Sequence, residues 1–498
     1  MMIEDLIVSL IEYGLQNKLI SRYDVIFVLN RFIDLFKLEY FEKRKYKKEK
    51  DLDVILENMV EYALKNNIIK EDTGFYKDSF DTKIMGVITP KPSYIIPKFK
   101  KLYNLSPKKS TDYFYKFNRI TNDIRVSRIK KDMRWKIKDQ YGLFEISINL
   151  SKPEKDPKQI AKDLENKNKA YPLCVLCREN EGFYGGENKK SFCNHRVIPI
   201  KLCGEQYFFQ YSPYAYYKEH SIVFKKEHTP MKIEEKTFFK LLDFVRIFPH
   251  YFIGSNADLP LVGGSILSHD HFQAGRYIFA IQKAPFKLNF KMRGFLDVNM
   301  GFISWPLSVI RLQSKNLVSL GKAASKILNV WQNYDDESVS ISSHTGKIRH
   351  NTITPIARKR RDFFEFDLIL RNNKITEKDP FGIFNTKEKY HNIKKENIGL
   401  IEAMGLAVLP ARLKIEMALL KKAILEKQEI GKIDRIKKHR DWAERLVLKY
   451  KDIGEDNIDS ILKFEIGKTF VEILGCCAIF KEDEDGENAM RKFVGFLQ

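Results

Sequence analysis

The sequence predicts an α+β fold in which helical regions flank a central part built from strands and helices. Residues 1–70 carry apolar side chains at the spacing of amphipathic helices. In the central part, short runs alternate apolar and polar side chains, as half-buried strands do. From Glu396 to the end helical spacing dominates again, with Pro410 as one break. A chain of 498 residues also exceeds the usual size of a single core, so several domains are expected.

These patterns predict four regions along the chain. They are a mainly helical N-terminal region at 1–150, a motif-rich part at 151–285, a second α+β part at 286–395 and a helical C-terminal region at 396–498. Residues 152–169 are charged and nearly free of large apolar side chains. We interpret this segment as a surface helix or linker that marks a boundary.

The N-terminal region contains two segments of unusual pattern. Prolines at 90, 92 and 97 predict that residues 84–101 form a loop with short extended pieces. Residues 120–150 mix helix-like and strand-like spacing, and the pattern favours neither.

The central elements follow from local periodicity. Strands are predicted at residues 206–211, 221–224, 276–281 and 364–370, and the first two are expected to pair. Amphipathic helices are predicted at 234–248, where Pro249 ends the pattern, and at 315–334. The alternation at 364–370 predicts a strand with only one buried face.

Composition limits the classes of function. The chain holds 87 Lys and Arg against 65 Asp and Glu, a formal charge of +22, which favours anionic partners. The basic residues are scattered, however, so we expect phosphorylated metabolites and no nucleic acid. No run of 18 apolar residues is present, and Glu4 and Asp5 stand where a secretion signal would be basic. We therefore predict a cytoplasmic protein without a membrane partner.

Residues 263–275, GGSILSHDHFQAG, carry the strongest chemical signal. If this run is extended, His269, His271 and Gln273 share one face, while Asp270 and Phe272 point to the other. Glycines at the start of the run allow a backbone to approach a ligand closely. Two imidazoles and a carboxamide beside such a turn could receive a phosphate and present a nucleophile to it.

Cysteine usage points to a metal more than to disulfides. Six cysteines in so long a chain do not form a disulfide framework. Cys174 and Cys177 have the spacing of a zinc half-site, which needs two more ligands. A redox pair and coincidence are the rival interpretations of this spacing.

The segment GGSILSHDHFQAG resembles the active-site segment of the UDP-glucose–hexose-1-phosphate uridylyltransferases of the second type, relatives of the histidine-triad nucleotide transferases. The resemblance implies histidine-triad-like antiparallel sheets with flanking helices, with the triad-like part at 151–285. It implies that His271 is the catalytic nucleophile and that Gln273 replaces the third histidine of the triad. By position it also implies substrate-binding roles for Asn256, Gly264, Ser265 and Gln273.

The same resemblance implies a complete zinc site. Carried over by position, its ligands are Cys174, Cys177, His228 and His269, with His220 as the competing third ligand. No roles follow for His195, His350 or Arg358, although each lies in a segment similar to the family.

The function implied is the transfer of UMP from UDP-glucose to galactose 1-phosphate through a covalent uridylyl-histidine, as in the Leloir pathway of galactose metabolism. One alternative within enzymes is a dinucleoside polyphosphate phosphorylase or adenylyltransferase of the same superfamily. The alternative from another class is a zinc-stabilised nucleic-acid-binding protein, suggested by charge and by the Cys-x-x-Cys spacing. The oligomeric state stays open, with a homodimer as one option.

Overall fold

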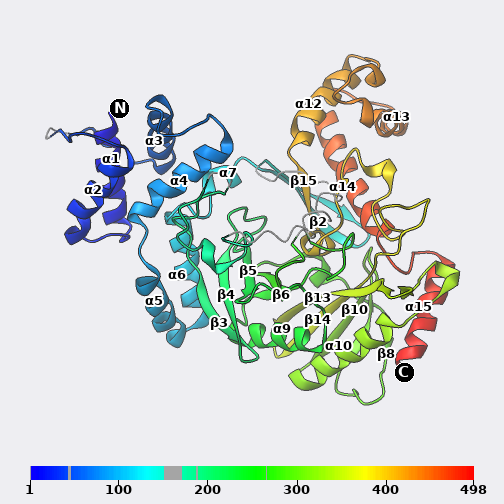
Figure 1. Cartoon of the computed structure of the whole chain (residues 1–498). Helices are drawn as coiled ribbons and strands as arrows, with labels where there is room; N and C mark the ends of the chain where they lie inside the picture. The colour runs from blue at the N-terminus through cyan, green and yellow to red at the C-terminus, as the bar shows by residue number, and fades with distance from the viewer. Residues whose placement is uncertain (1, 43–45, 151–170, 187–188, 265) are drawn as a thin grey trace.

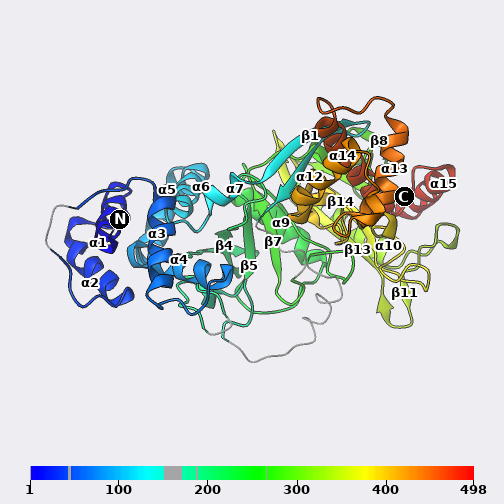
Figure 2. The ribbon, with the colours of Figure 1, turned by 90° about the horizontal axis from the view of Figure 1, so that it is seen from above.

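The computed structural model describes residues 2–42, 46–150, 171–186, 189–264 and 266–498. N-terminal helices and C-terminal helices lie at opposite ends of a large central sheet (Figures 1 and 2). The predicted α+β fold is therefore confirmed. The segment 152–169, predicted as a surface helix or linker, lies outside the described residues, as does Ser265, and the region boundaries predicted above stay predictions.

The described residues of the N-terminal region are mainly helical up to Ile129. Its helices are α1 (Ile3–Gln16), α2 (Val25–Leu35), α3 (Leu52–Lys65), α4 (Gly74–Ile88), α5 (Pro92–Leu105), α6 (Pro107–Ile120) and the short α7 (Val126–Ile129). The loop predicted at 84–101 is wrong. Pro92 is the first residue of α5, where the missing N–H would have no helical partner in any case. Pro97 lies inside α5 and removes one backbone hydrogen bond, while Ile95 and Phe99 of the same helix are buried in the core.

Ten strands form one antiparallel sheet. They are β3 (Ile198–Leu202), β4 (Glu205–Tyr211), β5 (Ser221–Lys225), β6 (Phe252–Gly254), β7 (His271–Gly275), β8 (Phe286–Phe290), β9 (Asn299–Ile303), β10 (Val309–Ser314), β13 (Asn351–Arg360) and β14 (Phe363–Asn372). Their order is β3-β4-β5-β7-β6-β13-β14-β10-β9-β8. The predicted pairing of 206–211 with 221–224 is confirmed as β4 with β5.

The strand predicted at 276–281 is wrong. Both neighbours of β7 end level with its last residues, since Ser221 of β5 faces Ala274 and Phe252 of β6 faces Gly275. No partner strand continues beyond this point in the described part of the chain, and a 3-10 turn forms at Ala280–Lys283 instead. The alternating apolar side chains at Tyr277 and Phe279 pack against each other and against Tyr217.

A smaller sheet resolves the segment at 120–150 and corrects part of the helical prediction for 396–498. Strands β1 (Met133–Asp139) and β2 (Gly142–Asn149) form a hairpin within residues 120–150, and β15 (Leu406–Pro410) joins β2 in parallel. The helical prediction for 396–498 missed β15, because a short, fully buried apolar run lacks the alternation of a half-buried strand. A two-stranded ribbon, β11 (His344–Thr345) with β12 (Ile348–Arg349), completes the described strands.

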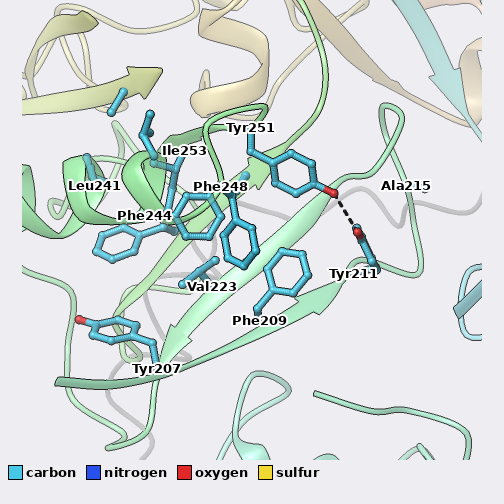
Figure 3. Packing of buried hydrophobic residues seen from close by; sticks show 14 of the residues in the cluster. Tyr207, Phe209, Tyr211, Ala215, Val223, Leu241, Phe244, Phe248, Tyr251 and Ile253 are labelled. Carbon is cyan, nitrogen blue, oxygen red and sulfur yellow. Dashed lines mark hydrogen bonds between the residues drawn. The ribbon is translucent and has the colours of Figure 1, made fainter. Parts of the chain in front are cut away.

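One face of the large sheet carries the main core. The predicted amphipathic helices are confirmed as α9 (Glu235–Ile247) and α10 (Leu317–Gln332), and both contact this sheet. Figure 3 shows Phe244 of α9 and Phe248 beside Phe209 of β4, with a hydrogen bond of 2.8 Å between the hydroxyls of Tyr211 and Tyr251. Because side chains alternate along β4, its remaining residues face the opposite side of the sheet.

The C-terminal helices form a second core with the smaller sheet. They are α11 (Leu400–Ala403), α12 (Arg412–Leu425), α13 (Arg440–Lys449) and α14 (Ile458–Cys476). The last helix, α15 (Glu484–Leu497), packs in the main core instead. Helix α15 lies apart from the others and returns to α10, where the rings of Phe493 and Trp331 meet edge to face at 5.6 Å. Among the described residues, no helix has both the length and the apolar character needed to cross a bilayer.

The prediction of one buried face for strand 364–370 is also wrong. Glu365 and Asp367, the expected exposed residues, are both 0% exposed. Arg311 lies on the neighbouring β10 and donates to Asp367 at 2.7 Å, while Arg358 of β13 pairs with both carboxylates. A charged pattern can therefore mark a doubly buried strand when arginines on adjacent strands neutralise it.

Candidate active site

Strand β7 presents two polar side chains on the face away from the main core. His271 faces Phe224 of β5, and Gln273 faces Ile222 of the same strand. Phe272, between them in sequence, points into the main core and stacks on Tyr207 at 5.9 Å. The neighbouring strands on both sides hold β7 in the middle of the sheet, so His271 and Gln273 lie on a rigid surface.

A cavity of about 510 Å³ lies over this face. Its floor is the sheet, and its walls come from parts of the chain that are distant in sequence. They include the turn after α6, the glycine segment before β7, the loop that leads into α11, and the segments around Leu176 and Phe192. The polar residues from the floor are Gln210, His220, His271 and Gln273, and those from the walls include Asp123, Arg125, Arg128, Asn256, Glu396 and Glu402.

The ring of His271 is oriented by the backbone. Its Nδ1 lies 2.8 Å from the carbonyl oxygen of His269, so Nδ1–H donates and the lone pair stays on Nε2. Burial lowers the pKa of His271 to about 4, which leaves the imidazole neutral near neutral pH. A neutral imidazole with its lone pair held on one nitrogen is the form required for nucleophilic attack.

Gln273 is oriented by His220. The Nε2 of His220 lies 3.2 Å from the side-chain oxygen of Gln273, so the imidazole donates and the amide nitrogen of Gln273 stays available as a donor. Burial lowers the pKa of His220 to about 4 as well. His220 therefore lies in the cavity. The alternative prediction, in which His220 is the third metal ligand, does not agree with this position.

The predicted metal ligands lie together. Cys174, Cys177, His228 and His269 each offer an atom, and these atoms all lie within 4.8 Å of one another. The Cys174 and Cys177 sulfurs are 3.6 Å apart, and the closest sulfur–Nδ1 distances are 3.3 Å to His269 and 3.2 Å to His228. A tetrahedral zinc site with normal bond lengths would give edges of roughly 3.3–3.8 Å.

The surroundings of the cluster also suit a cation. The Nε2 of His269 lies 2.8 Å from the carbonyl oxygen of Lys225, so this nitrogen donates and Nδ1 keeps its lone pair for a metal. The hydrogen bond with Cys174 lowers the pKa of the Cys177 thiol and favours the thiolate. The donor set and its spacing therefore fit zinc.

The glycine segment packs against Asn256. A Cβ on Gly264 would lie 2.5 Å from the Asn256 side-chain nitrogen, and one on Gly263 would lie 2.4 Å from the Ala257 carbonyl oxygen. Larger residues are therefore excluded at both positions. The Asn256 side-chain oxygen accepts from the backbone N–H of Leu400 at 2.9 Å, which ties this segment to the loop that enters α11. Of the four residues predicted to bind substrate, Asn256, Gly264 and Gln273 line the cavity.

His350 and Arg358, which lie in segments similar to the family, are outside the cavity. His350 contacts Asn373 at 2.9 Å and Thr345 at 2.7 Å, and Arg358 belongs to the buried charge cluster on β13 and β14. Neither lines the cavity.

The sequence analysis did not predict that residues of the N-terminal region form one wall of the cavity. Asp78 accepts from Arg125 at 2.8 Å and from Lys190 at 3.1 Å, and it also pairs with Arg128. Although burial opposes the effect, these cations lower the pKa of Asp78. The contact of Asp123 with His195 was missed in the same way. No local motif links these residues, because only the tertiary fold brings the end of α6 to the sheet.

The fold and the site define an α+β protein with a neutral, oriented histidine at the floor of a cavity, beside a Cys₂His₂ cluster to which the same chain segment contributes His269. Comparison with known families identifies it further. Residues 20–230 match the N-terminal domain of galactose-1-phosphate uridyl transferases, and residues 243–444 match the C-terminal domain. The chain belongs to the galactose-1-phosphate uridylyltransferase family, as the segment around His271 predicted.

Full-length relatives agree. A galactose-1-phosphate uridylyltransferase of Clostridium acetobutylicum is 49% identical over 499 residues, which covers 100% of both chains. One from Bacillus subtilis is 43% identical and covers 98% of this chain and 96% of its own. Among solved structures, the yeast Ap4A phosphorylase Apa2 gives a TM-score of 0.30 at 14% identity, over 61% of this chain and 90% of that one. That similarity is too low to support an argument.

Proposed function

We propose that the protein transfers UMP from UDP-glucose to galactose 1-phosphate through a covalent intermediate on His271. The observation that carries the proposal is the buried imidazole whose Nδ1 is bound to the His269 carbonyl, in a chain of this family. The relatives that match almost the whole chain carry the name galactose-1-phosphate uridylyltransferase, which fits this activity. The consistent naming favours it over a phosphorylase acting on dinucleoside polyphosphates.

In the first half of the reaction, Nε2 of His271 attacks the α-phosphorus of UDP-glucose. An N–P bond forms, the bond from the α-phosphorus to the bridging oxygen breaks, and glucose 1-phosphate leaves with the electron pair. The Nδ1–H stays bonded to the His269 carbonyl, which stabilises the positive charge on the substituted ring. In the second half, a phosphate oxygen of galactose 1-phosphate attacks the same phosphorus and the N–P bond breaks. No net proton transfer is needed.

Gln273 supports the phosphorus centre in this proposal. Its side-chain oxygen is occupied by His220, so its amide nitrogen donates to a non-bridging phosphate oxygen. Asn256 and the backbone around Gly264 line the same cavity and bind the substrate phosphates. Ser265 would join them by its place in the sequence.

Zinc is the proposed metal, held by Cys174, Cys177, His228 and His269. When bound, it supplies structural cross-linking and takes no part in bond making. His269 connects the two sites, because its side chain is a proposed ligand and its carbonyl orients His271.

Nucleic acid is not among the proposed partners. Basic side chains at the cavity wall are paired with carboxylates, as Arg125 is with Asp78 and Asp81. A nucleic-acid footprint would instead present unpaired basic groups and give affinity that falls steeply with salt. Micromolar DNA binding that persists at physiological salt, without transferase activity, would favour the zinc-stabilised nucleic-acid-binding alternative.

Mass spectrometry of the intact protein tests the intermediate. Mixed with UDP-glucose and no acceptor, the protein should gain one nucleotide adduct that is labile to acid and stable to base, as a phosphorus–nitrogen bond is. Adding galactose 1-phosphate should remove the adduct and release UDP-galactose. Peptide mapping should locate it on the segment that contains His271, and an adduct elsewhere would end this mechanism.

A further inference from the structure

A buried chain of three side chains connects the N-terminal region to the cavity floor. Asp123 follows α6, His195 precedes β3, and Gln210 lies on β4. The Nδ1 of His195 is 2.9 Å from an Asp123 carboxylate oxygen, and its Nε2 is 3.0 Å from the side-chain oxygen of Gln210. Asp123, His195 and Gln210 are 7%, 5% and 6% exposed. All three line the cavity, and none has a role in the mechanism above.

Both ring nitrogens of His195 face oxygen atoms, which a doubly protonated imidazole requires. Burial alone disfavours the charge, but the Asp123 carboxylate and the Gln210 oxygen outweigh it and raise the pKa of His195 above its ordinary value. Glu181 adds to the same effect. If the imidazole were neutral with its proton on Nδ1, facing Asp123, then Nε2 would be an acceptor. Gln210 would in that case have to turn its amide nitrogen towards Nε2 and donate to it.

The charged state of His195 therefore decides which end of the Gln210 amide faces the cavity. With the oxygen bound to His195, the amide nitrogen points away from it. Within the described part of the chain, the only side-chain hydrogen bond of Gln210 is the one its oxygen makes with His195. Gln210, Ile222 and Gln273 are aligned across three adjacent strands, so the free donor lies roughly 10 Å from Gln273.

The neighbourhood of this donor suits a flat heterocycle. Phe192 lines the cavity and its ring lies 6.2 Å from that of His195. Leu176 and Ile222 add apolar surface to the same cavity. An aromatic face with a single oriented donor is how proteins commonly bind a nucleobase, by stacking on the ring and by a hydrogen bond to its edge.

We infer that Asp123 and His195 lock Gln210 as a hydrogen-bond donor to a ring carbonyl of the nucleobase, so that the site selects uracil over cytosine. Uracil presents a carbonyl acceptor where cytosine presents an amino donor. The locked amide nitrogen of Gln210 can donate a hydrogen bond to the uracil carbonyl. With cytosine, the same nitrogen would face an amino group, which is also a donor, and no hydrogen bond could form. Gln210 is the contacting residue, and Asp123 and His195 are positioning residues. The inference rests on the proposed function, in which a uridylyl group is transferred.

Binding of UMP and CMP, measured by calorimetry on the full chain, tests the lock. The wild-type protein should prefer UMP. Gln210→Glu, which offers only acceptors near neutral pH, and Gln210→Met, which offers neither, should each reduce the UMP-to-CMP affinity ratio by roughly tenfold or more. Asp123→Asn should reduce it by a similar factor, because His195 then loses its proton and the amide is free to turn.

A second measurement separates positioning from general structural damage. The imidazole nitrogen chemical shifts should report a doubly protonated His195 in the wild type and a neutral ring in Asp123→Asn. The matched control is Glu416→Gln, since Glu416 contacts another buried histidine, His439, at 3.0 Å in the C-terminal region. This variant should leave the UMP-to-CMP ratio unchanged.

The outcomes distinguish the inference from the function on which it rests. Failure of the wild-type protein to bind UMP would contradict both. UMP binding with a ratio that stays at the wild-type value in Gln210→Glu, Gln210→Met and Asp123→Asn would overturn the lock and leave the transferase proposal intact. A neutral His195 in the wild type would also overturn it.

Discussion

Two histidines separated by one residue serve two sites of different character. His269 turns its Nδ1 towards the sulfur of Cys174 at 3.3 Å and donates from Nε2 to the Lys225 carbonyl. His271 does the reverse, donating from Nδ1 to a carbonyl at 2.8 Å and keeping its Nε2 for the cavity. The same side chain thus becomes a candidate metal ligand or a candidate nucleophile according to which nitrogen the backbone engages.

The two sites are also connected. The carbonyl that orients His271 belongs to His269, so the position of the cluster influences the orientation of the nucleophile. This arrangement predicts a graded series of effects. Removal of the nucleophile should affect transfer most, removal of its phosphate donor less, disruption of the cluster less again, and changes on the far face of β7 least.

The largest effect is expected for His271→Ala. Transfer should fall by on the order of 10⁴-fold or more, because the proposed covalent intermediate forms on the His271 imidazole. The initial rate of UDP-galactose formation measures it, and the nucleotide adduct should vanish in parallel. His344→Ala is the matched control, since His344 is exposed and outside the cavity. Full transfer by His271→Ala would mean that the two histidines do not divide their roles as proposed.

A smaller effect is expected for Gln273→Ala. Loss of one preorganised donor to the phosphorus centre should slow transfer by roughly 10²–10³-fold. The adduct should still form on His271, more slowly, because the nucleophile is unchanged. Rapid-mixing mass spectrometry measures the rate of adduct formation. A shift of the adduct to another residue would contradict the assignment of His271 as the nucleophile.

Disruption of the cluster should act mainly on stability. Cys177→Ser should lose the one zinc ion per chain that elemental analysis is expected to find in the wild type, and should lower the melting temperature. Transfer should fall by roughly 10–100-fold through displacement of the His269 carbonyl. Cys203→Ser, at an exposed cysteine outside the cluster, should change none of these values. A metal-free wild type that is stable and active would contradict the zinc site.

Much of this arrangement is predictable from sequence because it is local. Alternation along a strand separates His271 and Gln273 from Phe272, whatever the rest of the fold does. The two-residue spacing of Cys174 and Cys177 is likewise local and is typical of a metal half-site, with a redox pair and coincidence as its rival interpretations. The resemblance to the family supplied the other two candidate ligands, His228 and His269, and the four candidate ligand atoms do lie together.

The rest depends on tertiary contacts that no local pattern records. Asp123 and His195 are 72 residues apart and meet only because the end of α6 packs beside the sheet. The charge of Glu365 predicts exposure, but the residue is buried because Arg358, on the adjacent strand, pairs with it. The proline-rich segment is helical because Pro92 falls on the one helical position that tolerates it best.

The smallest effect is expected on the far face of β7. There the carboxylate of Asp270 accepts from the hydroxyl of buried Tyr207 at 2.7 Å, and Phe272 stacks on the same tyrosine. Tyr207→Phe removes only the hydroxyl, so it should cost about 1–2 kcal/mol of unfolding free energy, measured by denaturant titration.

Transfer by Tyr207→Phe should stay within about twofold of the wild type, because the sheet separates Asp270 from the cavity and the stacked ring is retained. Tyr13→Phe is the matched control, since it removes a phenol hydrogen bond of 2.9 Å to the Ile120 carbonyl in the N-terminal helices. Both variants should lose stability without losing transfer. A drop in transfer of more than about tenfold in Tyr207→Phe alone would show that the charge of Asp270 acts through the strand on His271, and that the two faces of β7 are not independent.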